Sequence, residues 1–330
     1  MIIQSTFKPA WWLKNPHLQT IYPTLCRRVS PVPPLQIESL ITEDQDVLEI
    51  VHCGNKSAPI ILLLHGLAGN SQSIYIQGLQ AALYQNGLRS MSLNFRGCYS
   101  PNRTALCYHL GEINDIHFLY QQLRQREPNT PIAAIGFSLG GSVLLNWLSQ
   151  CNSVELFAAI AISVPYQLAI CSTQLDQGFA KLYRCYLLSE LKKYMRNKQR
   201  YLKSIQAEKE LTILKQLGDL NKVYSFWDYD NRVAAKLYHF VDVHDYYQQC
   251  SSRFKLKSIQ IPTLLIQALD DPFMNSAVIP RAEELSSSTV LEYSEFGGHV
   301  GFVSGDLPTQ PHYWLESRIL TFLQQHLPNP

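Results

Sequence analysis

The chain has few charged residues and no long apolar run. Only 16% of its 330 residues are Asp, Glu, Lys or Arg, against roughly 25% in most soluble chains, so a disordered protein is excluded. The longest apolar stretches, Ile60–Leu64 and Leu156–Ile162, are far shorter than the roughly 20 residues that a membrane-spanning helix needs. We also expect no signal peptide, because no basic segment followed by an apolar one opens the chain.

A strong excess of charge of either sign is also absent. The formal net charge is +2, which is too small to indicate a nucleic-acid partner. The eight cysteines are scattered and include no CxxC pair. In a large chain without an export signal this pattern predicts free thiols and a cytoplasmic protein.

A regular alternation of strand-like and helical segments begins after residue 45. Residues 1–45 are rich in proline and aromatic side chains, which predicts an ordered arm packed on a body. The following alternation predicts an α/β fold with a mainly parallel central sheet and helices on both faces. We expect strands at 47–53, 60–64, 90–95, 132–135, 156–162, 263–268 and 289–293, and helices at 71–85, 114–124, 139–149, 280–286 and 312–326.

The alternation stops between residues 171 and 252, where no strand-like run occurs. Two segments, 182–191 and 202–217, have helical spacing. Residues 171–222 hold eleven basic and five acidic side chains, a net charge of about +6, in a chain that is otherwise slightly acidic. We therefore predict a helical, basic lid (171–252) inserted between two segments of one core, residues 46–170 and 253–330.

The strongest chemical motif is Gly136-Phe137-Ser138-Leu139-Gly140. It follows a predicted strand and opens a predicted helix, which is the setting that a nucleophile elbow requires. The glycines are needed because larger side chains two residues away from the serine would collide with the neighbouring strand and helix. The motif predicts that Ser138 is the nucleophile of a serine hydrolase.

A serine nucleophile needs a histidine base, and the histidine needs a carboxylate. In the order typical of α/β-hydrolases the acid follows the serine and the histidine comes last. The strand at 263–268 runs into Asp270-Asp271-Pro272, and Gly297-Gly298-His299 follows the next strand. We predict His299 as the base and favour Asp271, next to the proline, as the acid; Asp270 would then bond to the backbone of the turn.

An oxyanion hole should complete the site, because ester attack leaves negative charge on the carbonyl oxygen. One donor is expected to be the backbone N–H of Leu139, directly after the serine. The loop His65-Gly66-Leu67-Ala68-Gly69-Asn70 follows a predicted strand, and we assign the second donor to the N–H of Leu67. We expect His65 to hold this loop rather than to act as a base.

These residues lie among longer motifs that span nearly the whole chain. The motifs are Phe7-Lys8-Pro9-Ala10-Trp11-Trp12, Asn15-Pro16-His17-Leu18-Gln19-Thr20, Asn94-Phe95-Arg96-Gly97-Cys98, Asp245-Tyr246-Tyr247, Asp270-Asp271-Pro272-Phe273 and Gly297-Gly298-His299-Val300-Gly301-Phe302. With them the chain resembles the YheT-like family of α/β-hydrolases, bacterial esterases that are similar to eukaryotic abhydrolase-domain lipases and phospholipases. The resemblance implies an α/β-hydrolase fold, carboxylic ester substrates, and Ser138, Asp271 and His299 as the triad.

Together these features predict a serine hydrolase that cleaves carboxylic esters, with apolar acyl chains, through an acyl-enzyme. Such chemistry needs no metal and no organic cofactor. Two alternatives remain open: a phospholipase or monoacylglycerol lipase that docks on anionic membranes through the basic lid, and a non-catalytic binding member of the fold. The expected partner is a small-molecule or lipid ester; oligomeric state is not indicated.

Overall fold

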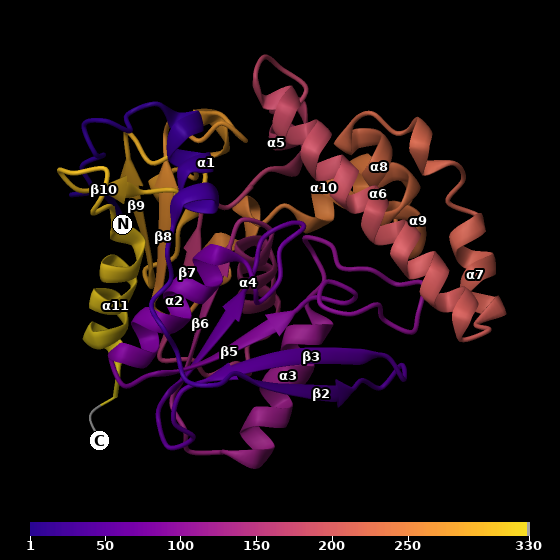
Figure 1. Ribbon diagram of the computed structural model, residues 1–330, viewed down its shortest axis with the longest axis horizontal. Helices are drawn as coiled ribbons and strands as arrows, with labels where there is room; N and C mark the ends of the chain where they lie inside the picture. Colours follow the sequence, from indigo (N-terminus) through magenta and orange to yellow (C-terminus); the bar gives the residue numbers. More distant parts are fainter. Residues whose placement is uncertain (329–330) are drawn as a thin grey trace.

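The computed structural model describes residues 1–328, and its centre is a nine-stranded sheet (Figure 1). The strand order is β1-β9-β8-β7-β6-β4-β5-β3-β2. β3 is antiparallel to both of its neighbours, β2 and β5, and the other pairs are parallel. The strands are β1 Ile2–Gln4, β2 Gln36–Ile41, β3 Val47–Cys53, β4 Ile60–Leu64, β5 Arg89–Asn94, β6 Ile132–Phe137, β7 Ala158–Ile162, β8 Thr263–Ala268 and β9 Thr289–Ser294. The mainly parallel sheet confirms the predicted fold class.

Helices cover both faces of this sheet, which explains the continuous apolar run of β4. Ile60, Leu62 and Leu64 pack on the face covered by α3 and α4. Ile61 and Leu63 pack on the other face with α2 and α11. These helices are α2 Ile74–Gln85, α3 Asn114–Arg126, α4 Leu139–Gln150 and α11 Trp314–His326. A strand buried on both faces has no polar side, so it does not alternate.

The arm contributes to the sheet at both edges. β1 pairs with β9 at one edge, and β2, which lies within the predicted arm, pairs with β3 at the other. Between them lies α1 (Pro16–Cys26). Asn15 caps this helix by accepting from the N–H groups of His17 and Leu18, and Pro16 occupies its first turn, where a missing N–H costs little.

Six helices lie between β7 and β8 and are gathered at the side of the molecule away from α11 (Figure 1). They are α5 Leu168–Gln174, α6 Ala180–Ser204, α7 Glu208–Lys215, α8 Phe226–Arg232, α9 Ala234–Leu237 and α10 Val243–Cys250. We call this group the lid. It contains no strand, as expected from the sequence.

The predicted helix 182–191 lies within a longer one, the 25-residue α6, and two other helix predictions are wrong. The predicted helix 202–217 is instead divided between the end of α6 and a shorter α7. The chain breaks between them because Gln206 takes a left-handed conformation, with φ of 58°. The helix predicted at 280–286 is only a 3-10 turn, Ala282–Glu284, because Arg281 is extended and β9 begins soon after.

Candidate active site

Ser138 lies in a sharp turn between β6 and α4. Its backbone has φ 52° and ψ −117°, a strained combination for any residue other than glycine. The turn is possible because glycines flank it: a Cβ on Gly140 would lie 2.4 Å from the carbonyl oxygen of Leu64, and one on Gly136 would lie 2.4 Å from that of Gly140. The geometry is that of the nucleophile elbow which the motif predicts.

Ser138, His299 and Asp271 form a continuous hydrogen-bonded chain. Ser138 Oγ lies 2.9 Å from His299 Nε2, and His299 Nδ1 lies 2.8 Å from Asp271 Oδ2. The Asp271 side chain is 1% exposed and also accepts the N–H of Phe273. The ring of Phe273 stacks on His299, with centroids 4.0 Å apart and planes at 7°. The structure thus brings together the three residues that the sequence predicts to be catalytic.

Asp270 points to the histidine loop rather than to the imidazole. Its Oδ1 accepts the backbone N–H of Gly298 at 2.9 Å, so it bonds to backbone as expected, but in the neighbouring loop. Burial raises the pKa of Asp270 to about 6. The two adjacent acids therefore have separate geometries, and only Asp271 contacts His299.

The backbone around the expected oxyanion hole leaves two donors free. Tyr75 and Tyr108 hydroxyls accept the N–H groups of Gly66 and Ala68. The N–H groups of Leu67 and Leu139 have no acceptor among residues 1–328. Both residues line the same cavity as Ser138 and His299. Their free N–H groups fit the predicted oxyanion donors.

His65 holds the loop that carries Leu67. Its Nε2 accepts the N–H of Phe95 at 3.1 Å, so Nδ1 carries the proton and donates to the carbonyl of Gly66 at 2.8 Å. Complete burial lowers the pKa of His65 to about 4, which keeps the ring neutral. His65 therefore holds the loop, as we expected, and its ring is not hydrogen-bonded to Ser138.

The arm contacts the histidine loop through residues to which the sequence analysis assigned no function. The hydroxyl of Thr20 accepts the N–H of His299, and the Gln19 side chain bonds to both backbone groups of Val303. Gly301 approaches α1 so closely that a Cβ there would lie 2.3 Å from the Gln19 carbonyl. The only sequence signal was the Asn15–Thr20 motif itself, which does not indicate what it touches.

An apolar cavity, which we call the active-site cavity, opens beside Ser138. Leu67 and Leu139, the predicted oxyanion residues, line it from the body, and the apolar residues that line it from the lid are Leu168, Leu175, Leu187 and Phe226. Three polar side chains from the lid, Ser172, Asp230 and Tyr247, also reach it. The arrangement suits a mainly apolar substrate group held next to a serine nucleophile.

Comparison with known proteins places this site in a family. The family pattern for the alpha/beta hydrolase fold matches residues 59–306. The chain is 36% identical to the Escherichia coli protein named "Putative esterase YheT" over 97% of this chain and 94% of that one. The chain belongs to the α/β-hydrolase fold family. The predicted resemblance to the YheT-like family is also confirmed.

More distant proteins are similar over most of this chain. Human Phospholipase ABHD3 is 27% identical over 94% of this chain and 77% of its own. The solved structure of the Pyrococcus furiosus esterase Pf2001 superposes with a TM-score of 0.56 at 18% identity, covering 92% of this chain and 99% of that one. At this identity the superposition establishes the fold alone.

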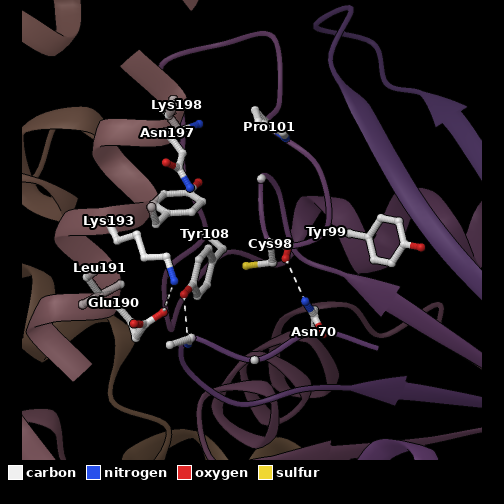
Figure 2. Close-up of a pocket in the computed structure, with 14 residues that line it drawn as sticks. Asn70, Cys98, Tyr99, Pro101, Tyr108, Glu190, Leu191, Lys193, Asn197 and Lys198 are labelled. Carbon is white, nitrogen blue, oxygen red and sulfur yellow. Dashed lines mark hydrogen bonds and ion pairs between the residues drawn. The ribbon is translucent and has the colours of Figure 1, made fainter. Parts of the chain in front are cut away.

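In this α/β-hydrolase, residues 190–198 of α6 hold the lid against the body. Figure 2 shows a second cavity, with Glu190, Leu191, Lys193, Asn197 and Lys198 of α6 on one side and Asn70, Cys98, Tyr99, Pro101 and Tyr108 on the other. Buried Lys198 donates to the carbonyls of Thr104 and Leu106 and to the side chain of Asn102. Neither Ser138 nor His299 lines this cavity.

No helix within residues 1–328 combines the length and apolar character needed to cross a membrane. All eight cysteines are free thiols, as predicted.

Proposed function

We propose that this protein hydrolyses carboxylic esters, with Ser138 as nucleophile, His299 as general base and acid, and Asp271 as the carboxylate that orients the imidazole. The hydrogen-bonded chain from Ser138 Oγ through His299 to Asp271 carries the proposal. The prediction of a carboxylic ester hydrolase is borne out by relatives and structural neighbours whose names are esterase, phospholipase and lipase. The assignment of roles to the three residues is our inference from geometry.

Each step uses groups that already lie in place. His299 Nε2 takes the hydroxyl proton as Ser138 Oγ bonds to the ester carbonyl, and the N–H groups of Leu67 and Leu139 hold the resulting oxyanion. The tetrahedral centre then loses the alcohol, which receives the proton from His299, and an acyl-enzyme remains. Water, deprotonated by His299, then attacks this acyl group, and His299 returns the proton to Ser138 Oγ as the acid leaves.

Replacing the nucleophile tests the mechanism directly. We expect Ser138→Ala to lower kcat for a p-nitrophenyl ester by about 10⁴-fold or more, because no other group forms the acyl-enzyme. Ser149→Ala, at the far end of α4 where the hydroxyl bonds only to the Asn146 carbonyl, should keep wild-type turnover. Equal rates for wild type and Ser138→Ala would reject the mechanism.

Covalent labelling separates this enzyme from a non-catalytic binding member of the fold. A fluorophosphonate probe should label Ser138 in the folded wild type, since it needs a serine activated by its base. The His299→Ala variant should label slowly or not at all. If folded wild type is not labelled, the binding-protein alternative takes the place of our proposal.

We also propose that the first turns of α6 contact anionic membranes. Phe179, Leu182 and Tyr186 are 50%, 59% and 64% exposed there. Lys181 and Arg184 lie among them, and α6 as a whole has eight basic side chains and one acidic one. Exposed aromatic and aliphatic side chains interleaved with lysines and arginines are typical of interfacial helices. Free cysteines are in keeping with a cytoplasmic protein that would meet such lipids on the inner leaflet.

Vesicle assays test this second proposal. Turnover of a long-chain ester should rise on phosphatidylglycerol vesicles relative to phosphatidylcholine vesicles and should fall as salt is added. Leu182→Ser should reduce vesicle binding, while turnover of a short dissolved ester stays at the wild-type rate. If lipid charge and ionic strength make no difference, the membrane contact is rejected and ester hydrolysis is unaffected.

A further inference from the structure

One carboxyl group lies inside the apolar interior beside the nucleophile. Asp230, on α8, lines the active-site cavity and also a smaller one, which we call the inner cavity. The two cavities share five lining residues and therefore lie next to each other. The shared residues are Leu67, Leu110, Leu139, Phe226 and Asp230. Asp230 is the polar member of this set, and it is 9% exposed.

Asp230 uses only one of its two oxygens within the protein. Tyr247 donates its hydroxyl proton to Oδ2 at 2.7 Å. That proton is then committed, so the Ser172 hydroxyl, 2.7 Å from the same tyrosine oxygen, must donate to Tyr247. In this relay Oδ2 accepts a hydrogen bond, and Oδ1 takes no part. Among residues 1–328 no group donates to Oδ1, and no Lys, Arg or His forms an ion pair with Asp230.

A buried carboxyl group destabilises the folded protein when one of its oxygens has no hydrogen-bond donor and no cation lies beside it. Burial raises the pKa of Asp230 to about 7, because the charged form is poorly solvated there. Packing alone would favour an apolar side chain at this position. A donor supplied by a ligand would satisfy the open oxygen and offset the cost.

The position of Asp230 relative to His299 indicates which part of an ester it meets. The alcohol must leave on the His299 side, because the imidazole protonates the leaving oxygen. The inner cavity shares the oxyanion residues Leu67 and Leu139 with the active-site cavity but is lined by neither Ser138 nor His299. A group that extends past the oxyanion residues to Asp230 therefore belongs to the acyl side.

We propose that Asp230 is a specificity-determining residue which accepts a hydrogen bond from a hydroxyl or ammonium group on the acyl chain of the ester substrate. The preferred substrate is then an ester whose acyl chain is apolar near the carbonyl and carries a hydrogen-bond donor further along. This inference rests on the proposed ester hydrolysis at Ser138 and narrows the purely apolar acyl chain expected from the sequence.

Matched substrates test the inference. The probes are p-nitrophenyl esters of graded chain length, each plain acyl chain paired with one of equal length that ends in a hydroxyl and one that ends in an ammonium group. At one chain length the wild type should turn over a donor-bearing ester with kcat/KM about tenfold or more above its plain partner. The hydroxyl and ammonium arms distinguish a neutral donor from a cationic one.

Variants on one helix locate the effect. Asp230→Leu should reverse the preference and favour the plain chain, a gain that general damage to the fold would not produce. Asp230→Asn should abolish any preference for ammonium, because it removes the charge and keeps the size. Asp228→Asn is the matched control, since Asp228 pairs with Arg232 outside both cavities, and its substrate ratio should equal that of wild type.

Two results would overturn the proposal: a wild type that prefers plain chains at every length, or a ratio that Asp230→Leu and Asp230→Asn both leave unchanged. Either result, combined with an inactive Ser138→Ala, rejects the role of Asp230 and leaves ester hydrolysis intact. Turnover that survives in Ser138→Ala would instead reject the proposed function itself.

Discussion

The backbone N–H of His299 donates to the hydroxyl of Thr20 at 2.9 Å, across 279 positions of sequence. Thr20 in turn donates to the carbonyl of Pro16 within α1, so its hydroxyl both donates one hydrogen bond and accepts another. The loop that carries the proposed base is therefore held by the N-terminal arm as well as by Asp271. We therefore expect the arm to help position the imidazole of His299.

Removing the Thr20 hydroxyl should slow the chemical step. In Thr20→Val the N–H of His299 loses its acceptor, and we expect kcat to fall about fivefold with KM little changed, since the loss of one neutral hydrogen bond is worth about 1 kcal/mol. Thr20→Ser keeps the hydroxyl and should restore most of kcat. Thr24→Val, on the exposed face of the same helix, should behave as wild type. Steady-state kinetics on one p-nitrophenyl ester measures all three, and a normal kcat in Thr20→Val would contradict the positioning role.

Asp270 should add a second ionisation to the acid side of the curve of kcat/KM against pH. Its carboxylate accepts the Gly298 N–H, and its pKa is raised to about 6 by burial. As pH falls through about 6 the carboxylate gains a proton and becomes a weaker acceptor, so kcat/KM of wild type should fall steeply. Asp270→Asn cannot titrate, and its acid limb should be shallower. Identical acid limbs in the two proteins would contradict this assignment.

Local patterns predicted the hydrogen-bonded residues well, because the elbow, the acidic turn and the histidine loop each carry their own signal. Gly136 and Gly140 flank the serine within five residues, and Pro272 marks the acid. The contact between Thr20 and His299 has no such signal, since it depends on how the arm crosses the finished sheet. The same holds for Asp230, whose role depends on what α8 faces. The sequence did not indicate the break between α6 and α7. The break depends on a left-handed backbone at Gln206, and glutamine is not a residue type that favours this conformation.

Lys198 should be the main anchor of the lid. It is 1% exposed, and its ammonium donates to two backbone carbonyls and the Asn102 side chain. Lys198→Met keeps the volume but removes all three bonds: Asn102 Oδ1 loses its donor, and the carbonyls of Thr104 and Leu106 keep only the Asn102 Nδ2 group. Relief of the buried charge offsets part of the loss, and we expect a net destabilisation of about 2 kcal/mol.

Lys193→Met is the matched control for this prediction. Lys193 is on the same helix, but its side chain is 61% exposed and its pairing with Glu190 spans 3.5 Å, so the change should be within about 0.5 kcal/mol. Urea denaturation of the three proteins gives both values. Equal stability of Lys198→Met and wild type would show that the lid is held by its apolar contacts alone.

Gly140 should tolerate no side chain, because its Cα lies against the end of β4. A Cβ there would come within 2.4 Å of the Leu64 carbonyl oxygen and 2.6 Å of that of His65, and both are backbone atoms that cannot rotate away. Gly140→Ala must therefore displace the helix that follows Ser138 or the loop that carries Leu67. We expect the free energy of unfolding to fall by about 3 kcal/mol or more, and ester turnover to be near that of Ser138→Ala.

Gly87→Ala is the control for this prediction. The new methyl group meets nothing within 4 Å, and only the φ of 71° is unfavourable. The free energy of unfolding should therefore fall by about 1 kcal/mol, with activity retained. Comparing the urea midpoints and turnover of the two variants separates steric contact at the elbow from the general cost of replacing a glycine, and equal effects at both positions would contradict the close approach of α4 to β4.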